Sequence, residues 1–450
     1  MSTLMVSISG VRGIVGESLT PAIVQKYALA FGTFINKSPI IVGRDSRTSG
    51  PFISNILKGS LQATGHDVID IGIVPTPTVQ MEIIHQQAAG GVAVTASHNP
   101  AQWNGLKFMD ANGRFLSPQD AGQVYKLAKQ ANFSVKNWKQ VGIEKTDNGA
   151  NDRHIKAILD LPFINVAAIK KRKFIVVIDC VNGAGGLIIP QLLNKLGCAI
   201  IPINDEPNGK FAHTPEPLPE NLGQLKKAVK DTKADVGFAV DPDVDRCAIV
   251  DEKGRPIGEE YTLAVAVKFY LSKKLGPVVV NMSTSRACED IAKYYNCPFL
   301  RSKVGEINVV EEMIAQDAII GGEGNGGVIL PDLHLGRDAP LAVAFTLQAM
   351  FEYEDTLSAL VQSLPRYTMV KDKITIEGKD PDKIIKKLID KFSDKKVNLV
   401  DGLKIDEDDY WVHLRKSNTE PIIRIIAEAR SLKQAKSIVE EYSGIINKLS

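Results

Sequence analysis

The stretch KFIVVIDCVNGAGG (residues 173–186) joins an unbroken apolar run to a glycine-bearing turn. The segment IIPQLLNKLG (188–197) follows with helical spacing, and CAIIPIND (198–205) is a second apolar run. An apolar run without polar alternation is typical of a strand that is buried on both faces of a sheet. The order strand, turn, amphipathic helix, strand therefore predicts an α/β unit.

Two other stretches repeat this pattern. One begins at PIIVGRDSRTSG (39–50), continues through a predicted helix at 51–64 and ends at HDVIDIGIV (66–74). The other begins at GPVVVNMSTS (276–285) and ends at CPFLRSK (297–303). Three copies of one pattern predict three similar α/β domains with mixed or parallel sheets.

Length and turn-rich stretches indicate four domains. A chain of 450 residues exceeds the roughly 250–300 residues that one hydrophobic core serves. Turn-forming residues gather near 147–152, near 251–258 and after 363–367. In DPDKIIKKLIDKF, one helical face carries Ile384, Ile385, Leu388, Ile389 and Phe392. The predicted fold is three α/β domains at 1–150, 151–253 and 254–368, with a closing α+β domain at 369–450.

Composition excludes several classes of partner. With 54 basic and 52 acidic residues, the chain has no excess charge to hold a nucleic-acid backbone or an anionic membrane. The five cysteines have no C-x-x-C spacing, which argues against a disulfide framework and a thiolate zinc site. The start MSTLMVSISGVRG does not resemble a signal peptide, and no apolar run reaches the roughly 18 residues of a membrane span. We expect a cytoplasmic protein.

The stretch DPDVDR (241–246) follows the apolar run VGFAV (236–240). Its proline disfavours helix, so Asp241, Asp243 and Asp245 alternate along extended or looped chain and can point the same way. Converging carboxylates repel one another unless a cation neutralises them, and an all-oxygen site suits Mg²⁺ or Ca²⁺ better than zinc. The stretch predicts a site for a hard divalent metal.

Three other interpretations of DPDVDR compete with this one. An EF-hand loop requires glycine where Arg246 stands, and the following CAIV is strand-like. A haloacid-dehalogenase-type motif, with Asp241 as nucleophile, requires threonine or valine where Asp245 stands. An acidic surface turn is the third.

The stretch TASHNP (95–100) also follows an apolar run, GGVAV. Taken alone it is typical of a turn. A Ser-His-Asp triad is not supported, because no G-x-S-x-G is present and the side chains of the adjacent Ser97 and His98 are expected to point apart. A lone hydroxyl nucleophile beside a metal site suits phosphoryl transfer better than acyl transfer.

Two later loops carry polar groups for a ligand. In GGEGNGG (321–327) no helix follows, so the dinucleotide interpretation fails, and the glycines leave Glu323 and Asn325 exposed for sugar hydroxyls. In RKSNTEP (415–421), hydroxyl, amide and backbone donors beside Arg415 and Arg424 suit a phosphate. A glycine hairpin and a plain turn are the alternatives. Other cations near turns are more often surface charges when taken singly: Arg12, Arg44, Arg47, Lys107, Lys303 and Arg337.

Taken in order, TASHNP, DPDVDR, GEGNGG and RKSNTEP match the motifs of the α-D-phosphohexomutase family, which the chain resembles over essentially its full length. The resemblance implies four domains around a central cleft. It implies that Ser97 is a phosphoserine that exchanges its phosphoryl group with the substrate. Mg²⁺ would be held by Asp241, Asp243, Asp245 and a phosphate oxygen on Ser97. The other implied catalytic residues are Arg12, His98, Lys107 and Arg246. The implied substrate-binding residues are Lys303, Glu323, Asn325, Arg337, Arg415, Ser417, Asn418, Thr419 and Arg424.

The implied activity is interconversion of hexose 6-phosphate and hexose 1-phosphate through a 1,6-bisphosphate. Glucose- or glucosamine-1,6-bisphosphate would be the activator. Glu420 and Arg424 resemble the amino-sugar branch, so we expect phosphoglucosamine mutase activity, with phosphomannomutase or phosphoglucomutase activity as the alternative. The expected partner is a small-molecule hexose phosphate, not a nucleic acid or a membrane. We expect a monomer or homodimer and a hinge motion of the last domain.

One departure from the family leaves the proton acceptor open. Many members have G-E-x-S-G-H in the third motif, where this chain has Asn325 and Gly327, so the acid-base histidine is missing. Lys107, His98 and a metal-adjacent water are the candidates. Two rival classes are a Mg²⁺-dependent phosphatase with Asp241 as nucleophile and a non-catalytic sugar-phosphate binding protein.

Overall fold

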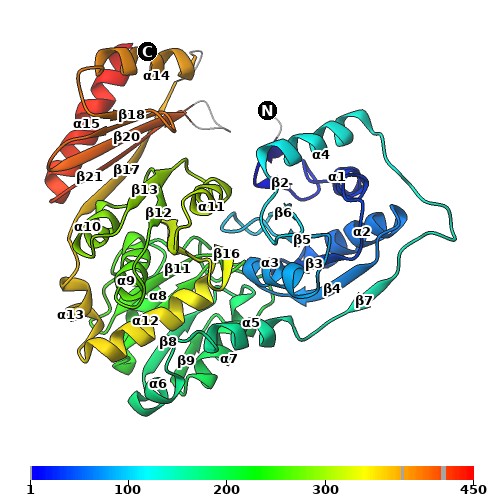
Figure 1. Cartoon of the computed structure of the whole chain (residues 1–450), viewed down its shortest axis with the longest axis horizontal. Coiled ribbons are helices and arrows are strands. Elements are labelled where there is room, and N and C mark those ends of the chain that lie inside the picture. Colours follow the sequence, from blue (N-terminus) through cyan, green and yellow to red (C-terminus); the bar gives the residue numbers. More distant parts are fainter. Residues whose placement is uncertain (1–2, 377–379, 417–421, 450) are drawn as a thin grey trace. The chain divides into compact units, whose positions relative to one another are not determined.

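The structure is a computed structural model that describes residues 3–376, 380–416 and 422–449. The chain divides into two compact units, Met1–Thr262 with Gly326–Leu360 and Leu263–Asn325 with Val361–Ser450. Figure 1 shows the order of their helices and strands. None of the helices in the described ranges is long and apolar enough to cross a bilayer.

The first unit begins with a seven-stranded sheet in the order β1-β2-β6-β5-β3-β4-β7. Strand β3 is parallel to β4 and β5, whereas β6 is antiparallel to β5 and β2. The strands are β1 (Met5–Ser7), β2 (Gly10–Ile14), β3 (Ile40–Arg44), β4 (Val68–Ile73), β5 (Gly90–Val94), β6 (Trp103–Met109) and β7 (Glu144–Thr146). The helices are α1 (Pro21–Phe34), α2 (Gly50–Ala63), α3 (Thr76–His85) and α4 (Pro118–Gln130).

The same unit holds a four-stranded sheet in the order β11-β10-β8-β9, in which only β11 is antiparallel to its neighbour. Its strands are β8 (Ile175–Asp179), β9 (Ala199–Ile203), β10 (Val236–Val240) and β11 (Cys247–Asp251). The helices are α5 (Ala150–Leu159), α6 (Val166–Arg172), α7 (Gly185–Lys195) and α8 (Gly223–Thr232). The antiparallel strands β15 (Gly327–Leu330) and β16 (His334–Arg337) and the buried helix α12 (Ala339–Tyr353) complete the unit.

In the second unit, β12 is parallel to β13 and β14. The elements of this part are β12 (Val278–Asn281), α10 (Arg286–Tyr294), β13 (Phe299–Ser302), α11 (Glu306–Ala315) and β14 (Ile320–Glu323). Helices α9 (Glu259–Leu271) and α13 (Leu357–Gln362) run across the division between the units.

The C-terminal part of the second unit is an antiparallel sheet in the order β17-β21-β20-β19-β18. Its elements are β17 (Thr368–Thr375), α14 (Pro381–Lys391), β18 (Val397–Asn398), β19 (Leu403–Asp406), β20 (Tyr410–Lys416), β21 (Ile422–Ala429) and α15 (Leu432–Leu449). Asp380 caps α14, and the predicted apolar face packs into the core with Ile384, Ile385, Leu388 and Phe392 buried. Ile389 lies only partly buried at its edge.

The expected threefold repeat is present along the chain. Each copy runs strand, helix, strand, helix, strand and then a further strand, as β3-α2-β4-α3-β5-β6, β8-α7-β9-α8-β10-β11 and β12-α10-β13-α11-β14-β15. TASHNP, DPDVDR and GEGNGG each lie where the third strand of a copy ends and the fourth begins. The repeat therefore presents each motif at an equivalent loop.

The prediction of strands buried on both faces is correct for the first strand of each copy and wrong for the second. Strands β8 and β12 are buried almost throughout, as is β3. Strands β4, β9 and β13 all contain half-buried or exposed residues. Strands β9 and β13 lie at sheet edges, and β4 lies next to the short, exposed edge strand β7. An apolar run alone does not distinguish a central strand from an edge strand.

Candidate active site

Three carboxylates meet in the loop after β10. The backbone N–H groups of Asp245 and Arg246 both donate to Asp241 Oδ1 at 3.1 Å, so the first aspartate closes the turn on itself. One oxygen from each of Asp241, Asp243 and Asp245 lies within 4.8 Å of the other two. The three side chains are at most 1% exposed, and they point into one space, as their alternation predicts.

Residues from three other elements surround this triad. Asp243 Oδ2 accepts hydrogen bonds from Lys107 Nζ on β6 and from Thr76 Oγ1 at the start of α3, each at 2.6 Å. Asp245 Oδ2 accepts from Arg337 Nη2, at the end of β16, also at 2.6 Å. Nothing in the sequence marks Thr76 as part of a site, because PTPT is an ordinary helix start. Asp243 and Asp245 therefore each have one carboxylate oxygen that accepts hydrogen bonds from these side chains.

Electrostatics separates the members of the triad. Burial raises the pKa of the Asp241 carboxyl, and repulsion from Asp245 and Asp243 raises it further. Burial acts the same way on Asp243, but the charge and hydrogen bonds of Lys107 overcome it and hold the pKa of Asp243 below its ordinary value. The environment therefore favours the ionised form of Asp243 and disfavours that of Asp241.

The donor set fits a hard divalent cation. Within the described part of the chain, Asp243 Oδ1 and Asp245 Oδ1 are buried and have no hydrogen-bond partner. An unpaired buried carboxylate oxygen is costly, and a metal ion relieves that cost. Three converging carboxylates without sulfur or imidazole are the ligands of Mg²⁺-type ions.

Ser97 lies against the triad although 144 positions separate it from Asp241 along the chain. Its Oγ donates to Asp241 Oδ2 at 3.1 Å, and the residue is 2% exposed. Its backbone adopts the left-handed region with φ 51°, which is uncommon for a residue other than glycine. The structure thus brings the candidate nucleophile and the candidate metal site into contact.

The expectation that Ser97 and His98 point apart is wrong. His98 Nδ1 lies 3.3 Å from Ser97 Oγ, and the left-handed backbone at Ser97 is the local feature that adjacency alone does not predict. The charge of Arg246, then burial and the charge of Arg12, lower the pKa of His98 to about 2. The imidazole is therefore neutral at ordinary pH.

A glutamate that sequence reasoning missed lies on the far side of this histidine. Glu216 Oε1 is 3.8 Å from His98 Nε2 and 3.5 Å from Arg246 Nη1. It belongs to the loop 204–222 that follows β9, a segment without a recognisable motif. Ser97, His98 and Glu216 form a chain of contacts that only the fold assembles.

Three other predicted cations take different positions. Arg12, on β2, is half-buried, with Nη1 3.5 Å from Asn99 Oδ1 in the TASHNP loop. The interpretation of Arg47 as a surface charge is wrong, because its side chain is 1% exposed. The guanidinium of Arg44 donates to the backbone oxygen of Asp45.

The remaining predicted residues belong to the second unit. Glu323 ends β14 and is buried, not exposed as expected: its Oε1 accepts from Asn281 Nδ2 at 2.8 Å and from the Gly305 N–H at 3.0 Å. Asn325 is half-buried, and its Oδ1 has no hydrogen-bond partner among the described residues. Lys303 is exposed after β13. The predicted contacts of Ser417, Asn418 and Thr419 lie outside the described residues.

A row of cations crosses the C-terminal sheet. Arg415 on β20 is directly opposite Arg424 on β21, and Arg424 is directly opposite Lys373 on β17. Like charges at opposing positions destabilise a sheet unless an anion lies between them. Lys373 was missed because its cross-strand register cannot be read from the sequence.

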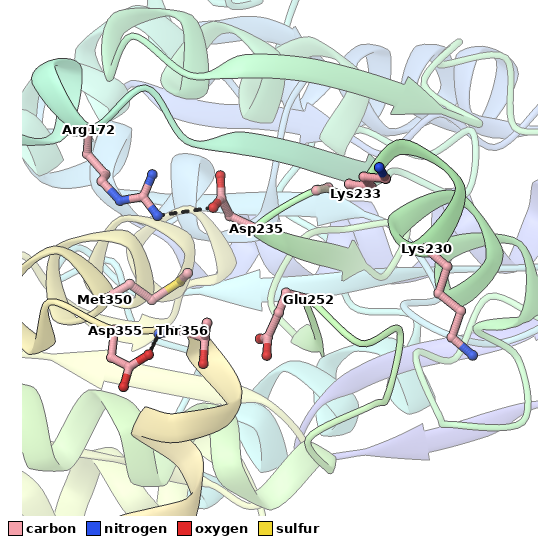
Figure 2. A pocket seen from close by; sticks show the side chains of 9 residues that line it. Arg172, Lys230, Lys233, Asp235, Glu252, Met350, Asp355 and Thr356 are labelled. Atoms are coloured by element: carbon pink, nitrogen blue, oxygen red, sulfur yellow. Dashed lines mark hydrogen bonds and ion pairs between the residues drawn. The ribbon is translucent and has the colours of Figure 1, made fainter.

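A separate hollow of about 390 Å³ in the first unit does not share this chemistry (Figure 2). It lies beside Asp235, at the opposite end of β10 from Asp241. The facing pair Arg172 and Asp235 form an ion pair at 3.2 Å, and Asp355 accepts the N–H of Thr356. The hollow therefore carries one ion pair of its own, and Lys230, Lys233 and Glu252 also line it.

Comparisons with known proteins agree with this architecture. The chain matches all four domains of the phosphoglucomutase/phosphomannomutase family: the alpha/beta/alpha domains I, II and III at residues 5–135, 152–254 and 258–367, and the C-terminal domain at 373–444. The phosphoglucomutase/phosphomannomutase of Thermococcus kodakarensis is 39% identical, with 96% of each chain covered. A probable phosphoglucosamine mutase of Pyrococcus horikoshii is 35% identical, with 97% of this chain and 96% of the relative covered. The structure of a family protein from Burkholderia thailandensis superimposes with a TM-score of 0.87 at 26% identity, with 99% of this chain and 98% of that chain covered.

The matched domains and the fold define a sugar-phosphate mutase of four domains, with the first three built on one α/β pattern. This chain belongs to the phosphoglucomutase/phosphomannomutase family and is an isomerase of the phosphohexomutase class. The family resemblance and the four-domain architecture predicted from the sequence are confirmed.

The loop that carries Glu216 has a pH-dependent anchor. A hydrogen bond to Asp179 raises the pKa of His213 above its ordinary value, with Nε2 and Oδ2 3.0 Å apart. The anchor stabilises the fold fully below the ordinary histidine pKa of 6.5 and is lost as pH rises through the higher folded pKa. In His213→Gln, amide exchange in residues 204–222 should be faster than in the wild type at pH 6, and the difference should vanish in alkaline solution.

The matched control is His85→Gln, which changes an exposed histidine on α3. It should leave exchange in this loop unchanged at every pH. A difference for His213→Gln that does not depend on pH would contradict the role of the charged imidazole.

Proposed function

We propose that this chain interconverts hexose 6-phosphate and hexose 1-phosphate through phosphorylated Ser97 and a bound 1,6-bisphosphate. The preferred substrate in this proposal is glucosamine phosphate, with glucose or mannose phosphate as the alternative. The observation that carries the mechanism is the 3.1 Å contact between Ser97 Oγ and Asp241 Oδ2. A phosphoryl group on Ser97 would lie beside the acidic triad.

Each residue near Ser97 suits a step of phosphoryl transfer. The phosphoryl group leaves Ser97 for a substrate hydroxyl, and Ser97 is later rephosphorylated by the other phosphate of the bisphosphate. Mg²⁺ held by the triad would neutralise charge on the transferring oxygens. Lys107 and Arg337 orient Asp243 and Asp245, and Arg12 and Arg246 supply further positive charge close to Ser97.

The proton acceptor that we propose is His98. Its Nδ1 is 3.3 Å from Ser97 Oγ, within reach of the hydroxyl proton as Ser97 attacks. The lowered pKa makes the ring a weak base, and the negative charge of a bound bisphosphate would raise that pKa. Lys107 is less suited, because its ammonium group donates to Asp243 at 2.6 Å. This assignment replaces the histidine that many relatives carry where this chain has Gly327.

The same contacts argue against Asp241 as the nucleophile of a phosphatase. Asp241 Oδ1 already accepts two backbone N–H groups, and its Oδ2 accepts the Ser97 hydroxyl. A carboxylate with both oxygens engaged is poorly placed to attack phosphorus.

Residues of the second unit suit the rest of the substrate. We assign the phosphate that is not reacting to Arg415 and Arg424, with Ser417, Asn418 and Thr419 from the predicted cradle. The row formed with Lys373 supports this assignment, because it concentrates positive charge. We assign Glu323 and Asn325 to binding of the sugar hydroxyls. Lys303 is assigned to the substrate cleft.

Several predictions from the sequence complete the proposal. The domain boundaries are placed at 1–150, 151–253, 254–368 and 369–450. The cofactor is Mg²⁺, and glucose- or glucosamine-1,6-bisphosphate is the activator. Balanced charge supports a small-molecule substrate without nucleic-acid or membrane partners. A cytoplasmic monomer or homodimer stays a prediction.

Ser97→Ala removes the phosphoryl acceptor but leaves the substrate contacts of the other domains. Turnover should fall roughly 10³-fold or more while the Kd of the hexose phosphate changes little. Coupled assays and calorimetry measure the two quantities. Ser117→Ala, which removes the cap of α4, should leave turnover unchanged.

Peptide mapping of the phosphoenzyme separates this mechanism from its rivals. A phosphate found on Asp241 would support the phosphatase. A protein that binds hexose phosphate without interconversion, even with trace bisphosphate, would be a binding protein.

Asp243→Asn should weaken Mg²⁺ binding about tenfold or more, because one charged ligand is lost. Calorimetric titration with Mg²⁺ measures this effect without activity. Asp235→Asn, at the other end of the same strand, is the matched control and should bind Mg²⁺ as the wild type does. If both variants bind Mg²⁺ with the same affinity, the triad is not the metal site.

A panel of glucosamine, N-acetylglucosamine, glucose and mannose 6-phosphates tests the substrate preference. We expect the highest kcat/KM for glucosamine 6-phosphate. A higher value for glucose or mannose 6-phosphate would favour the phosphoglucomutase or phosphomannomutase alternative and leave the mechanism intact.

A further inference from the structure

The loop that presents Ser97 needs support from outside itself. Ser97 has φ 51°, and its side chain must still face Asp241. A residue other than glycine persists in the left-handed region only where surrounding contacts hold it there. The contacts that hold this loop therefore determine where the nucleophile lies.

The guanidinium of Arg47 supplies most of these contacts. Its Nη2 donates to the carbonyl oxygens of Ser97 and Asn99 at 2.5 and 2.7 Å. Its Nη1 donates to those of Pro100 and Trp103 at 2.7 and 2.9 Å. The middle and the C-terminal end of the TASHNP loop are thus bound to one planar group.

The fifth donor of Arg47 connects the loop by a second route. Its Nε donates to Asp45 Oδ2 at 3.0 Å, and the same oxygen accepts from Thr95 Oγ1 at 2.7 Å. Thr95 Oγ1 in turn accepts the Ser97 N–H at 2.9 Å. The carbonyl and the N–H of Ser97 are therefore both linked to the pair Asp45 and Arg47.

The pair is itself firmly anchored. The Arg47 N–H donates to Asp45 Oδ1 at 2.9 Å, just before α2 begins. The guanidinium also packs on the ring of Phe211, 4.9 Å from its centroid, and Phe211 belongs to the loop that carries Glu216. Arg47 therefore cannot shift without disturbing two loops of the site.

We infer that Arg47, together with Asp45 and Thr95, is a positioning residue that holds Ser97 in its phosphorylatable geometry. This inference rests on the proposed function of Ser97. All five N–H donors of the guanidinium are engaged. A lysine ammonium group has only three N–H donors, and they do not lie in one plane. Positive charge alone would therefore not replace it.

The test compares Arg47→Lys with the wild type in single-turnover phosphorylation by glucose 1,6-bisphosphate. The phosphorylation rate and kcat should fall roughly 10- to 100-fold, because a nucleophile misplaced by about 1 Å loses that much. The KM for hexose phosphate and the Kd for Mg²⁺ should change less than about threefold. Amide exchange in residues 95–103 should be faster.

Thr95→Val is the second variant, because it keeps Arg47 and its charge but removes the hydroxyl link to Ser97. It should also slow phosphorylation, and the double variant should lose less than the product of the single losses. The matched control is Arg153→Lys, which alters ion pairs with Glu82 and Asp147 on the far side of α3 and should keep wild-type kinetics.

The outcomes are distinguishable. If Arg47→Lys phosphorylates Ser97 at the wild-type rate, the inference is overturned while the proposed function stands. It is equally overturned if kcat, KM and Mg²⁺ affinity all worsen in proportion to lost stability, as for a merely structural residue. If the wild type forms no phosphoserine at position 97, the proposed function itself fails.

Discussion

The repulsion among three buried carboxylates is the constraint on which the site depends. Asp241, Asp243 and Asp245 each place one oxygen within 4.8 Å of the others, and all three residues are buried. Such a cluster persists only with compensating charge and hydrogen bonds. The fold supplies part of this through Lys107, Arg337 and Thr76 and leaves two oxygens for a metal ion. The first and second α/β domains and the β16 segment are therefore tied to one another by the acidic loop.

The repeated topology explains why chemistry gathers in loops of one kind. In each copy the third strand ends at a motif. The side chains of the motifs therefore directly follow the buried strands β5, β10 and β14. Such strands hold a side chain more tightly than a mobile surface loop does. The three loops differ in their side chains: one carries a hydroxyl, one a carboxylate triad, and one a glutamate and an amide.

Much of this organisation is predictable from the sequence. The apolar runs identify the α/β copies, and the alternation of aspartates identifies the acidic cluster, because both are local patterns. The contacts of Arg47, Glu216 and Thr76 are not predictable, because each partner lies tens of positions away and is selected by tertiary packing. The approach of His98 to Ser97 depends on a single left-handed residue, and strand exposure depends on sheet order.

The opposed cations of the C-terminal sheet affect the stability of this domain. Arg415, Arg424 and Lys373 lie on adjacent strands, and their mutual repulsion weakens the empty sheet. An anion bound between them removes this penalty and stabilises the folded form by mass action. In the proposed function this anion is a sugar phosphate, so the resistance of the domain to unfolding and to proteases would rise with the supply of that ligand.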